Sequence, residues 1–215
     1  MKPNPGLRAS SLITIFVLFA VVLTGSLADA KPRDKERWNK YYDTDKYIFG
    51  EKPIRFLKEN VHLLPKGKTL DIAMGEGRNG VYLATKGFDV LGLDISEKGL
   101  EKAHQLASAN KVKIVTQVVD LETHQLAKNT YDLIICTYYM QRSLFPQFMD
   151  ALKPGGMALV ETFNLDYLKY KQFKRKYLLE ENELLKIFAD YKIIKYEVYD
   201  DGVEAYSSII VQKTK

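Results

Sequence analysis

The sequence contains few of the residues that cross-link small proteins or bind metal ions. Cys136 is the single cysteine among 215 residues, and there are only three histidines. One cysteine cannot form an internal disulfide and cannot supply a cysteine-based zinc site. The histidines, His62, His104 and His124, show no spacing typical of metal ligands. We therefore expect no metal and no covalent cross-link.

Concentrated charge is also missing. The formal net charge of +5 is spread over the whole chain, and no segment interleaves basic with aromatic residues. Such a segment is typical of proteins that bind nucleic acid, so we expect no nucleic acid partner. A hydrophobic content of 46% over 215 residues is sufficient for one well-buried domain.

The first 30 residues have the layout of a Sec-type signal peptide. Lys2 and Arg8 precede an apolar run from Leu12 to Leu23, and Ala28-Asp29-Ala30 has the small-x-small form of a cleavage site. Cleavage after Ala30 would release the remainder to the periplasm. Residues 1–30 are therefore set apart from a single domain at residues 31–215.

The segment that follows favours a different topology. Five cations lie directly downstream of the apolar run, against two upstream of it; the five are Lys31, Arg33, Lys35, Arg37 and Lys40. Positive flanks tend to stay in the cytoplasm, which favours an uncleaved single-pass inner-membrane anchor with a cytosolic domain. The sequence leaves export and N-terminal membrane attachment as alternatives.

From residue 31 onward, helical patterns alternate with short apolar runs. We expect helices at 54–64, 77–87, 97–110, 143–152 and 180–190, and strands at 68–74, 88–94, 112–120, 131–138 and 157–164. Two further alternating stretches, at 191–200 and 204–213, flank Asp201-Gly202, which is typical of an antiparallel hairpin. The predicted fold is α/β: a doubly wound, Rossmann-like, mostly parallel seven-stranded sheet that ends in this hairpin.

The turn after the first strand can hold two kinds of ligand. Gly75, Gly77 and Gly80 form the G-x-G-x-x-G pattern that lets a dinucleotide pyrophosphate approach the backbone. Asp94, at the end of the second strand, is placed to accept hydrogen bonds from the ribose of an adenosine. On these residues alone, a nicotinamide-dependent oxidoreductase is an open alternative.

Three features favour a cationic adenosine ligand without phosphate. Asp71 places a carboxylate ahead of the loop, which would repel a pyrophosphate and attract an ammonium or sulfonium. Only 19 residues separate Gly75 from Asp94, which is short for a dinucleotide unit. Asp120 ends the third strand, where it can accept from an adenine amino group. Each aspartate also has a plainer interpretation, since Asp71 can cap the next helix and the other two can belong to turns.

Four segments occur in the order found in class I S-adenosylmethionine-dependent methyltransferases. They are LDIAMGEGRN, VLGLDIS, VVDLET and YDLIICTYY followed by LKPGG. The upstream stretch WNKYYDTDKYIFGEKP and GEGRNGVYLA resemble the small stand-alone enzymes of the tellurite-resistance and thiopurine-methyltransferase type. The resemblance spans nearly all of residues 40–212.

This resemblance implies S-adenosylmethionine as the cofactor and assigns its contacts. Asp71 and the backbone around Gly75 and Gly77 would hold the methionine end, and Asp94 would bind the ribose. The remaining cofactor contacts would be Ile95, Asp120 and Leu121 at the adenine and Cys136 and Thr137 on the floor near the sulfonium.

The loop departs from the family pattern at two positions. Ala73 stands in place of the first glycine, and Met74 in place of a smaller residue. We expect Ala73 to have an ordinary φ angle, cofactor binding to be retained, and the cofactor site to be slightly narrowed.

Residues after the fourth strand are candidates for an acceptor site. Tyr138 and Tyr139 could wall the methyl path, and Arg142 could bind an anionic acceptor. By family likeness, Tyr47 and Phe49 would close over the cofactor. Surface exposure of Arg142 and ordinary packing of Tyr47 and Phe49 are the alternative interpretations.

The predicted function is methyl transfer to a small-molecule acceptor by in-line displacement. No catalytic acid or base can be assigned, because no Ser/His/Asp, Cys/His or paired-carboxylate arrangement is evident. The alternatives are an NAD-dependent oxidoreductase and a membrane-tethered domain that binds the cofactor without turning it over.

Overall fold

The computed structural model describes residues 32–214. The predicted signal peptide or membrane anchor at residues 1–30 lies outside the described residues. Within residues 32–214, no helix is both long enough and apolar enough to cross a bilayer.

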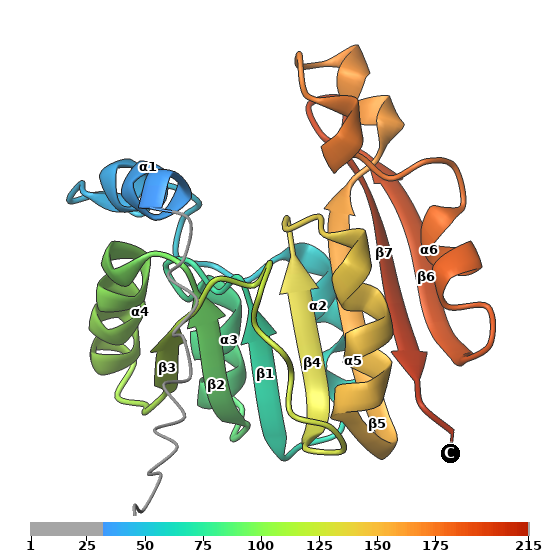
Figure 1. The fold of residues 1–215 in the computed structure, drawn as a ribbon, viewed down its shortest axis with the longest axis horizontal. Coiled ribbons are helices and arrows are strands. Elements are labelled where there is room, and N and C mark those ends of the chain that lie inside the picture. The colour runs from blue at the N-terminus through green and yellow to red at the C-terminus, as the bar shows by residue number, and fades with distance from the viewer. Residues whose placement is uncertain (1–31, 215) are drawn as a thin grey trace, which may run out of the picture.

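The centre of the fold is one seven-stranded sheet with the strand order β3-β2-β1-β4-β5-β7-β6 (Figure 1). Its strands are β1 (Lys68–Ile72), β2 (Asp89–Asp94), β3 (Val115–Val118), β4 (Tyr131–Thr137), β5 (Leu152–Phe163), β6 (Lys192–Asp200) and β7 (Ala205–Gln212). Strands β1 to β5 pair in parallel, whereas β7 pairs antiparallel with both β5 and β6. The predicted mostly parallel sheet with a C-terminal antiparallel hairpin is confirmed.

The helices are α1 (Pro32–Tyr42), α2 (Arg55–Asn60), α3 (Arg78–Thr85), α4 (Glu97–Ala109), α5 (Phe145–Ala151) and α6 (Glu183–Ile187), with 3₁₀ turns η1 (Val61–Leu63), η2 (Arg142–Leu144), η3 (Leu165–Lys169) and η4 (Arg175–Tyr177). As expected, α3, α4 and α5 connect β1 to β2, β2 to β3 and β4 to β5, whereas β3 and β4 are joined by a segment without a helix. Ser96 caps α4, because its hydroxyl accepts a hydrogen bond from the backbone N–H of Gly99 at 3.1 Å.

The two faces of the sheet are buried in two separate cores. Alternate residues of β4 point to opposite faces: Leu133 and Ile135 pack in a core with α2, α3 and α4, while Ile134 and Cys136 pack in a core with α5 and α6. Both faces of the sheet are therefore covered. In α/β proteins of this kind, ligands bind beyond the carboxyl ends of the parallel strands.

Two segments differ from the sequence-based expectation. The Leu152–Gly156 segment belongs to β5, and is not a turn before it, because Leu152 already pairs with Tyr131. The register then shifts, so that Met157 pairs with Leu133, and Gly155 accommodates the bulge with φ 81°. In addition, α1 was not expected; Figure 1 shows it above α4, at the edge toward which the arrows of β1, β2 and β4 point.

Candidate active site

The glycine loop lies between the end of β1 and the start of α3. Gly75 and Gly77 have φ angles of 55° and 86°, in the left-handed region that favours glycine. A Cβ atom at Gly77 would also lie 2.6 Å from the Cβ of Ala103 in α4. The loop therefore needs glycine at position 77 for its conformation and for its close approach to a neighbouring helix.

Ala73 contradicts the expectation of an ordinary backbone angle. Its φ is 53°, in the same left-handed region, where a side chain with a Cβ is strained. The sequence pattern could not show this, because alanine at the position of a family glycine indicated that the turn had changed. The alanine adopts a glycine-like φ and bears the strain at the edge of the site.

We expect Ala73→Gly to raise the free energy of unfolding by about 1 kcal/mol. Glycine adopts this φ without strain, which outweighs its larger entropy in the unfolded chain. Urea denaturation of the variant and the wild type would measure the difference. Ala84→Gly, inside α3, serves as the control, because a helical φ gives no relief and glycine there should cost about 0.5–1 kcal/mol. Equal losses at both positions would contradict strain at Ala73.

Met74 does not narrow the site. Its side chain is buried between α3 and β2, where a Cβ at Gly92 would lie 2.0 Å from its sulfur and one at Gly80 would lie 2.3 Å from its methyl group. The glycines at 80 and 92 make room for this larger side chain within the core. Gly80 thus serves the packing of α3 against β2, and the expected narrowing by Met74 is not seen.

Asp94 connects the end of β2 to the glycine loop. One carboxylate oxygen accepts a hydrogen bond from the backbone N–H of Gly75 at 2.7 Å, and the other accepts from that of Ser96 at 2.8 Å. Burial raises the pKa of this carboxyl group, and the backbone donors lower it. Each oxygen keeps a lone pair for a further donor. The structure thus brings Asp94 to the loop, where its predicted contact with a ribose stays a prediction.

Asp71 lies behind the loop, beneath the start of α3. Its side chain is buried, and Oδ2 has no hydrogen-bond partner. A Cβ at Gly80 would lie 2.7 Å from this oxygen. Burial raises the pKa of Asp71 to about 8, and the charge of Asp94 acts in the same direction. The N-cap of α3 is Gly77, and no side-chain hydrogen bond caps this helix, so the helix-capping alternative for Asp71 is not seen. A contact between Asp71 and a cofactor stays a prediction.

The predicted adenine contacts follow β2 and β3. Asp120 is 8% exposed, and its Oδ1 accepts from the backbone N–H of Glu122 at 2.9 Å, which forms a tight turn after β3. Leu121 is buried in the core that contains α5, while Ile95 is half-buried. Asp120 thus has the turn role named as its alternative, and a contact of any of these residues with adenine stays a prediction.

The end of β4 contributes one polar residue and one core residue. Thr137 accepts a hydrogen bond from the side-chain amide of Asn79 in α3 at 2.9 Å, which ties the end of β4 to the start of that helix. Cys136 points into the core below, and burial raises the pKa of its thiol. Sequence reasoning did not select Asn79, although it directly follows the loop.

The helix α1 covers the glycine loop from outside. Tyr42 is 6% exposed, and its ring stacks on Trp38 at a centroid distance of 5.6 Å. A Cβ at Gly75 would lie 2.7 Å from the Tyr42 hydroxyl oxygen, and one at Gly99 would lie 3.1 Å from its ring. Any ligand held by the loop would therefore lie next to this tyrosine, which sequence reasoning did not select.

A buried ion pair fastens the chain between α1 and α2 to the loop. Lys102 Nζ in α4 lies 2.5 Å from Glu76 Oε1, and their side chains are 9% and 2% exposed. Glu76 also accepts from the backbone N–H groups of Ile48 and Phe49 at 3.1 and 3.2 Å. The hydroxyl of Tyr47 donates a hydrogen bond to the carbonyl of Lys102 at 3.0 Å. Tyr47 therefore belongs to the contacts that surround this buried ion pair.

A cavity of about 680 Å³ opens beside the loop, at the ends of β4 and β5. The chain from Phe49 to Arg55 forms one wall. The cavity lining also includes aromatic and charged side chains from several elements, among them Phe49, Arg55, Arg78, Tyr138, Glu161 and Tyr206. Of the acceptor-site residues predicted from the sequence, Phe49 and Tyr138 line this cavity, and Tyr47, Tyr139 and Arg142 do not.

Tyr138 directly follows β4 and has a φ of 56°. Its hydroxyl donates to Glu161 Oε1 at 3.0 Å, and its ring lies 5.3 Å from the guanidinium carbon of Arg78. Strained non-glycine residues at a ligand-binding edge are typical of functional sites. Tyr139 turns the other way, and its hydroxyl donates to Gln141 at 2.6 Å.

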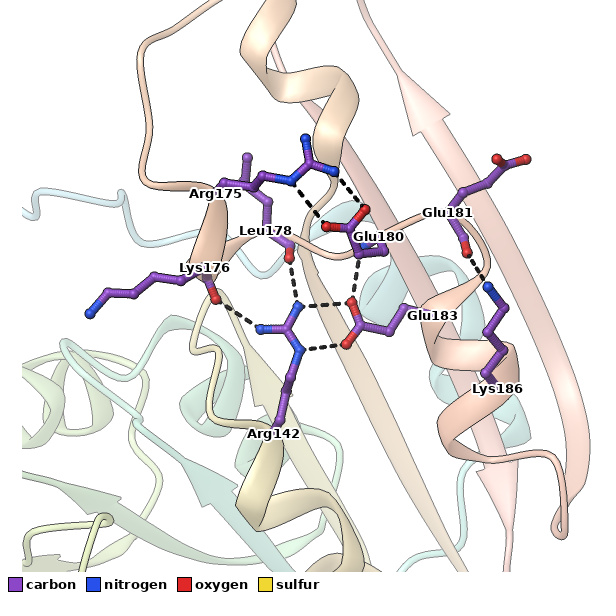
Figure 2. Close-up of polar contacts among 8 residues, drawn as sticks. All are labelled: Arg142, Arg175, Lys176, Leu178, Glu180, Glu181, Glu183 and Lys186. Atoms are coloured by element: carbon purple, nitrogen blue, oxygen red, sulfur yellow. Dashed lines mark hydrogen bonds and ion pairs between the residues drawn. The ribbon is translucent and has the colours of Figure 1, made fainter.

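Arg142 makes structural contacts. Figure 2 shows its guanidinium paired with Glu183, at 2.5 Å from Nε to Oε1 and 2.8 Å from Nη2 to Oε2. The same group donates to the carbonyls of Lys176 and Leu178 at 2.8 and 2.9 Å. These contacts hold the segment between β5 and α6 against η2. The cations at the cavity are Lys52, Arg55 and Arg78, which the sequence did not single out.

The residues around the loop fit a ligand that carries positive charge. Asp71 and Asp94 are buried carboxyl groups with raised pKa values, and Oδ2 of Asp71 is unpartnered. An ammonium or sulfonium nearby would favour the ionised form of both carboxyl groups, whereas a pyrophosphate would oppose their ionisation. The site thus fits S-adenosylmethionine better than a dinucleotide.

Comparison with known proteins identifies the family of the chain. Residues 34–203 match the family of tellurite resistance protein TehB. Hemagglutinin 1 of Eikenella corrodens is 26% identical over 150 residues, which are 66% of this chain and 49% of that protein. A probable S-adenosyl-L-methionine-dependent methyltransferase TehB of Haemophilus influenzae is 26% identical over 137 residues, 60% of this chain and 47% of that protein. The chain spans about half the length of these curated relatives.

The fold is also similar to that of a TehB protein. The crystal structure of TehB from Haemophilus influenzae superposes with a TM-score of 0.63 at 19% identity, over 83% of this chain and 66% of that one. At this identity the likeness shows the fold alone. The resemblance to S-adenosylmethionine-dependent methyltransferases of the tellurite-resistance type is confirmed by the family match over residues 34–203. The chain belongs to the TehB family of tellurite resistance proteins.

Proposed function

We propose that this protein transfers a methyl group from S-adenosylmethionine to a small-molecule acceptor. The family match over residues 34–203 carries the proposal, because a TehB relative is named as a probable S-adenosylmethionine-dependent methyltransferase. The acidic, phosphate-repelling surroundings of the loop support it, and they disfavour the nicotinamide alternative.

The cofactor would be held at the edge where the parallel strands end. The backbone of Gly75 and Gly77 would contact its methionine part, and Asp94 would accept hydrogen bonds from its ribose. When bound, S-adenosylmethionine supplies a methyl group on a sulfonium, which is an excellent leaving group. The protein then contributes mainly by orienting the acceptor in line with that methyl group, an effect worth up to about 7–11 kcal/mol.

The cavity supports a small acceptor. Its volume of about 680 Å³ lies within the roughly 300–1,000 Å³ typical of small-molecule sites. It also begins at Arg78, the residue after Gly77 of the loop, so an acceptor bound there would lie beside the cofactor.

We expect the full-length protein to bind S-adenosylmethionine and S-adenosylhomocysteine with a Kd of about 1 µM, and Asp94→Ala to weaken both about 10- to 100-fold. A hydrogen bond to a carboxylate contributes about 1.5–3 kcal/mol, which corresponds to that range. Isothermal titration calorimetry measures both ligands.

Asp89→Ala is the matched control, because Asp89 is exposed at the opposite end of the same strand and should leave binding unchanged. Failure of the wild type to bind either ligand would refute the proposed function. Tight NAD binding in a parallel titration would favour the oxidoreductase instead.

A further inference from the structure

We propose that the cavity binds a planar acceptor with a phenolic or enolic hydroxyl, and that Glu161 takes the proton from that hydroxyl. This inference rests on the proposed function and names the acceptor class and the base of the same site. The sequence pattern alone does not assign a catalytic base, and it does not single out Glu161.

Glu161 is a buried carboxyl group at the base of the cavity. It lies in β5, is 1% exposed, and lines the cavity wall. Its two oxygens accept hydrogen bonds from hydroxyl groups, from Tyr138 at 3.0 Å and from Ser208 in β7 at 2.6 Å. A carboxylate has about four lone-pair sites, so Glu161 can accept a third donor from a ligand.

The charge of Glu161 is not neutralised by a direct partner. No salt bridge in the described part of the chain includes it. Burial raises the pKa of Glu161, while its two hydroxyl donors and the more distant charges of Arg55 and Arg78 lower it. A buried carboxylate without an ion-pair partner gains most from accepting a proton, and this is the property required of a general base.

Glu161 also lies close to where methyl transfer would occur. Tyr138, its hydrogen-bond donor, follows Thr137 at the end of β4. Arg78, which borders the same cavity, follows the glycine loop. An acceptor in contact with Glu161 would therefore lie between β4 and the loop, on the side open to the cofactor.

The walls of the cavity select a flat acceptor. Aromatic rings of Phe49, Tyr138 and Tyr206 face it, and Arg78 lies over both Phe49 and Tyr138, at 6.0 and 5.3 Å from the ring centroids. Rings and guanidinium planes favour stacking on a planar ligand. These groups bind an aromatic or enol ring.

The charged groups select a hydroxyl as the nucleophile. Arg78 and Arg55 would stabilise the negative charge that develops on the oxygen, and Nε of Arg55 is buried without a hydrogen-bond partner. A protonated amine would be disfavoured by both guanidinium groups. A small oxyanion such as tellurite needs no base, and the Glu161 carboxylate would repel it.

In the proposed step, the O–H bond of the acceptor breaks and its proton moves to the Glu161 carboxylate. The acceptor oxygen forms a new bond to the methyl carbon, while the electron pair of the broken carbon–sulfur bond stays on sulfur. The products are a methyl ether, a neutral cofactor product and a protonated Glu161, which returns its proton to water. No oxidant or further reactant is needed.

The test compares two probes that differ in the hydroxyl alone. We expect wild-type protein, saturated with S-adenosylhomocysteine, to bind 2-naphthol about 10- to 100-fold more tightly than 2-methoxynaphthalene, because a hydrogen bond to a carboxylate is lost with the ether. Glu161→Gln should abolish this difference, as measured by naphthalene fluorescence.

Methyl transfer from S-adenosylmethionine to 2-naphthol should fall about 10²- to 10⁴-fold in the variant. Transfer to 2-naphthalenethiol, which ionises without a base, should fall less than about ten-fold.

The controls separate this inference from the proposed function. Glu101→Gln changes an exposed glutamate in α4 that pairs with Lys98 and does not line the cavity, and it should alter none of these values. If the wild type does not bind S-adenosylhomocysteine, the proposed function fails. If the wild type binds S-adenosylhomocysteine but shows no preference for 2-naphthol over the ether, this inference alone is overturned. The wild-type protein is sufficient for this comparison. A Glu161→Gln protein that retains both the preference and the rate would also overturn it.

Discussion

Replacing Lys102 with methionine is expected to lower the free energy of unfolding by about 3–5 kcal/mol. Lys102 Nζ and Glu76 form an ion pair that is almost fully buried, and removal of one partner leaves the other charge without compensation in a medium of low dielectric. Urea denaturation at neutral pH would measure the loss.

The expected loss is large because Lys102 has other partners. Its ammonium also donates to the backbone carbonyls of Thr44 and Lys46 at 3.0 and 2.6 Å. Glu76 accepts hydrogen bonds from two backbone N–H groups of the same segment, those of Ile48 and Phe49. The pair thus holds the whole segment that leads to Phe49 and the cavity. Methionine matches the lysine stem but replaces none of these hydrogen bonds.

Two comparisons test this explanation. Glu76→Gln combined with Lys102→Met removes both charges, so it should cost less than the sum of the single substitutions. Lys98→Met, one turn earlier in α4, removes an exposed lysine that pairs with Glu101 and should leave stability nearly unchanged. Similar losses at positions 98 and 102 would contradict a special role for the buried pair.

The sequence predicts features that depend on neighbours in the chain. Ser96 precedes a helical pattern and caps that helix, and Asp201-Gly202 joins the two strands of the hairpin. The alternation of apolar segments also predicts the mostly parallel sheet. The strand ends then bring Asp94 to the glycine loop without further information, because parallel strands end at one edge.

Features that depend on distant contacts were missed or assigned wrongly. Lys102 has the pattern of an ordinary helix-surface lysine, and it is buried only because the chain from Thr44 to Phe49 folds over it. Arg142 follows β4 and resembles an anion ligand, but Glu183, 41 residues later, pairs with it. Glu161 did carry a signal, because a charged residue inside an apolar strand is rarely buried without a role.

Replacing Asp71 with asparagine is expected to make the unfolding free energy less dependent on pH. Asp71 is buried, and its pKa is raised from 3.8 to about 8. A carboxyl group whose folded-state pKa is raised contributes stability that is complete below its unfolded-state pKa and is lost as pH rises through the folded-state value. The loss in the wild type should therefore develop between about pH 4 and pH 8. A shift of this size corresponds to roughly 6 kcal/mol. The asparagine variant should therefore be the more stable protein at pH 9 and similar to the wild type near pH 4.

The measurement is a series of urea denaturations from pH 4 to pH 9. Asp132→Asn is the matched control, because Lys153 holds the pKa of Asp132 below its usual value. Asp132 therefore stays ionised above pH 5, and its substitution should change stability by a constant amount from there to pH 9. Parallel curves for the wild type and Asp71→Asn would contradict the raised pKa.

The same series with saturating S-adenosylhomocysteine tests the predicted contact between Asp71 and the cofactor. An ammonium group near Asp71 would favour its ionised form and lower its pKa in the complex. Affinity for S-adenosylhomocysteine should then increase with pH in the wild type and not in Asp71→Asn, because binding and ionisation are linked. Identical pH profiles of affinity would leave Asp71 as a buried carboxyl group behind the loop without a contact to the cofactor, and Asp94 as the acidic ligand of the site.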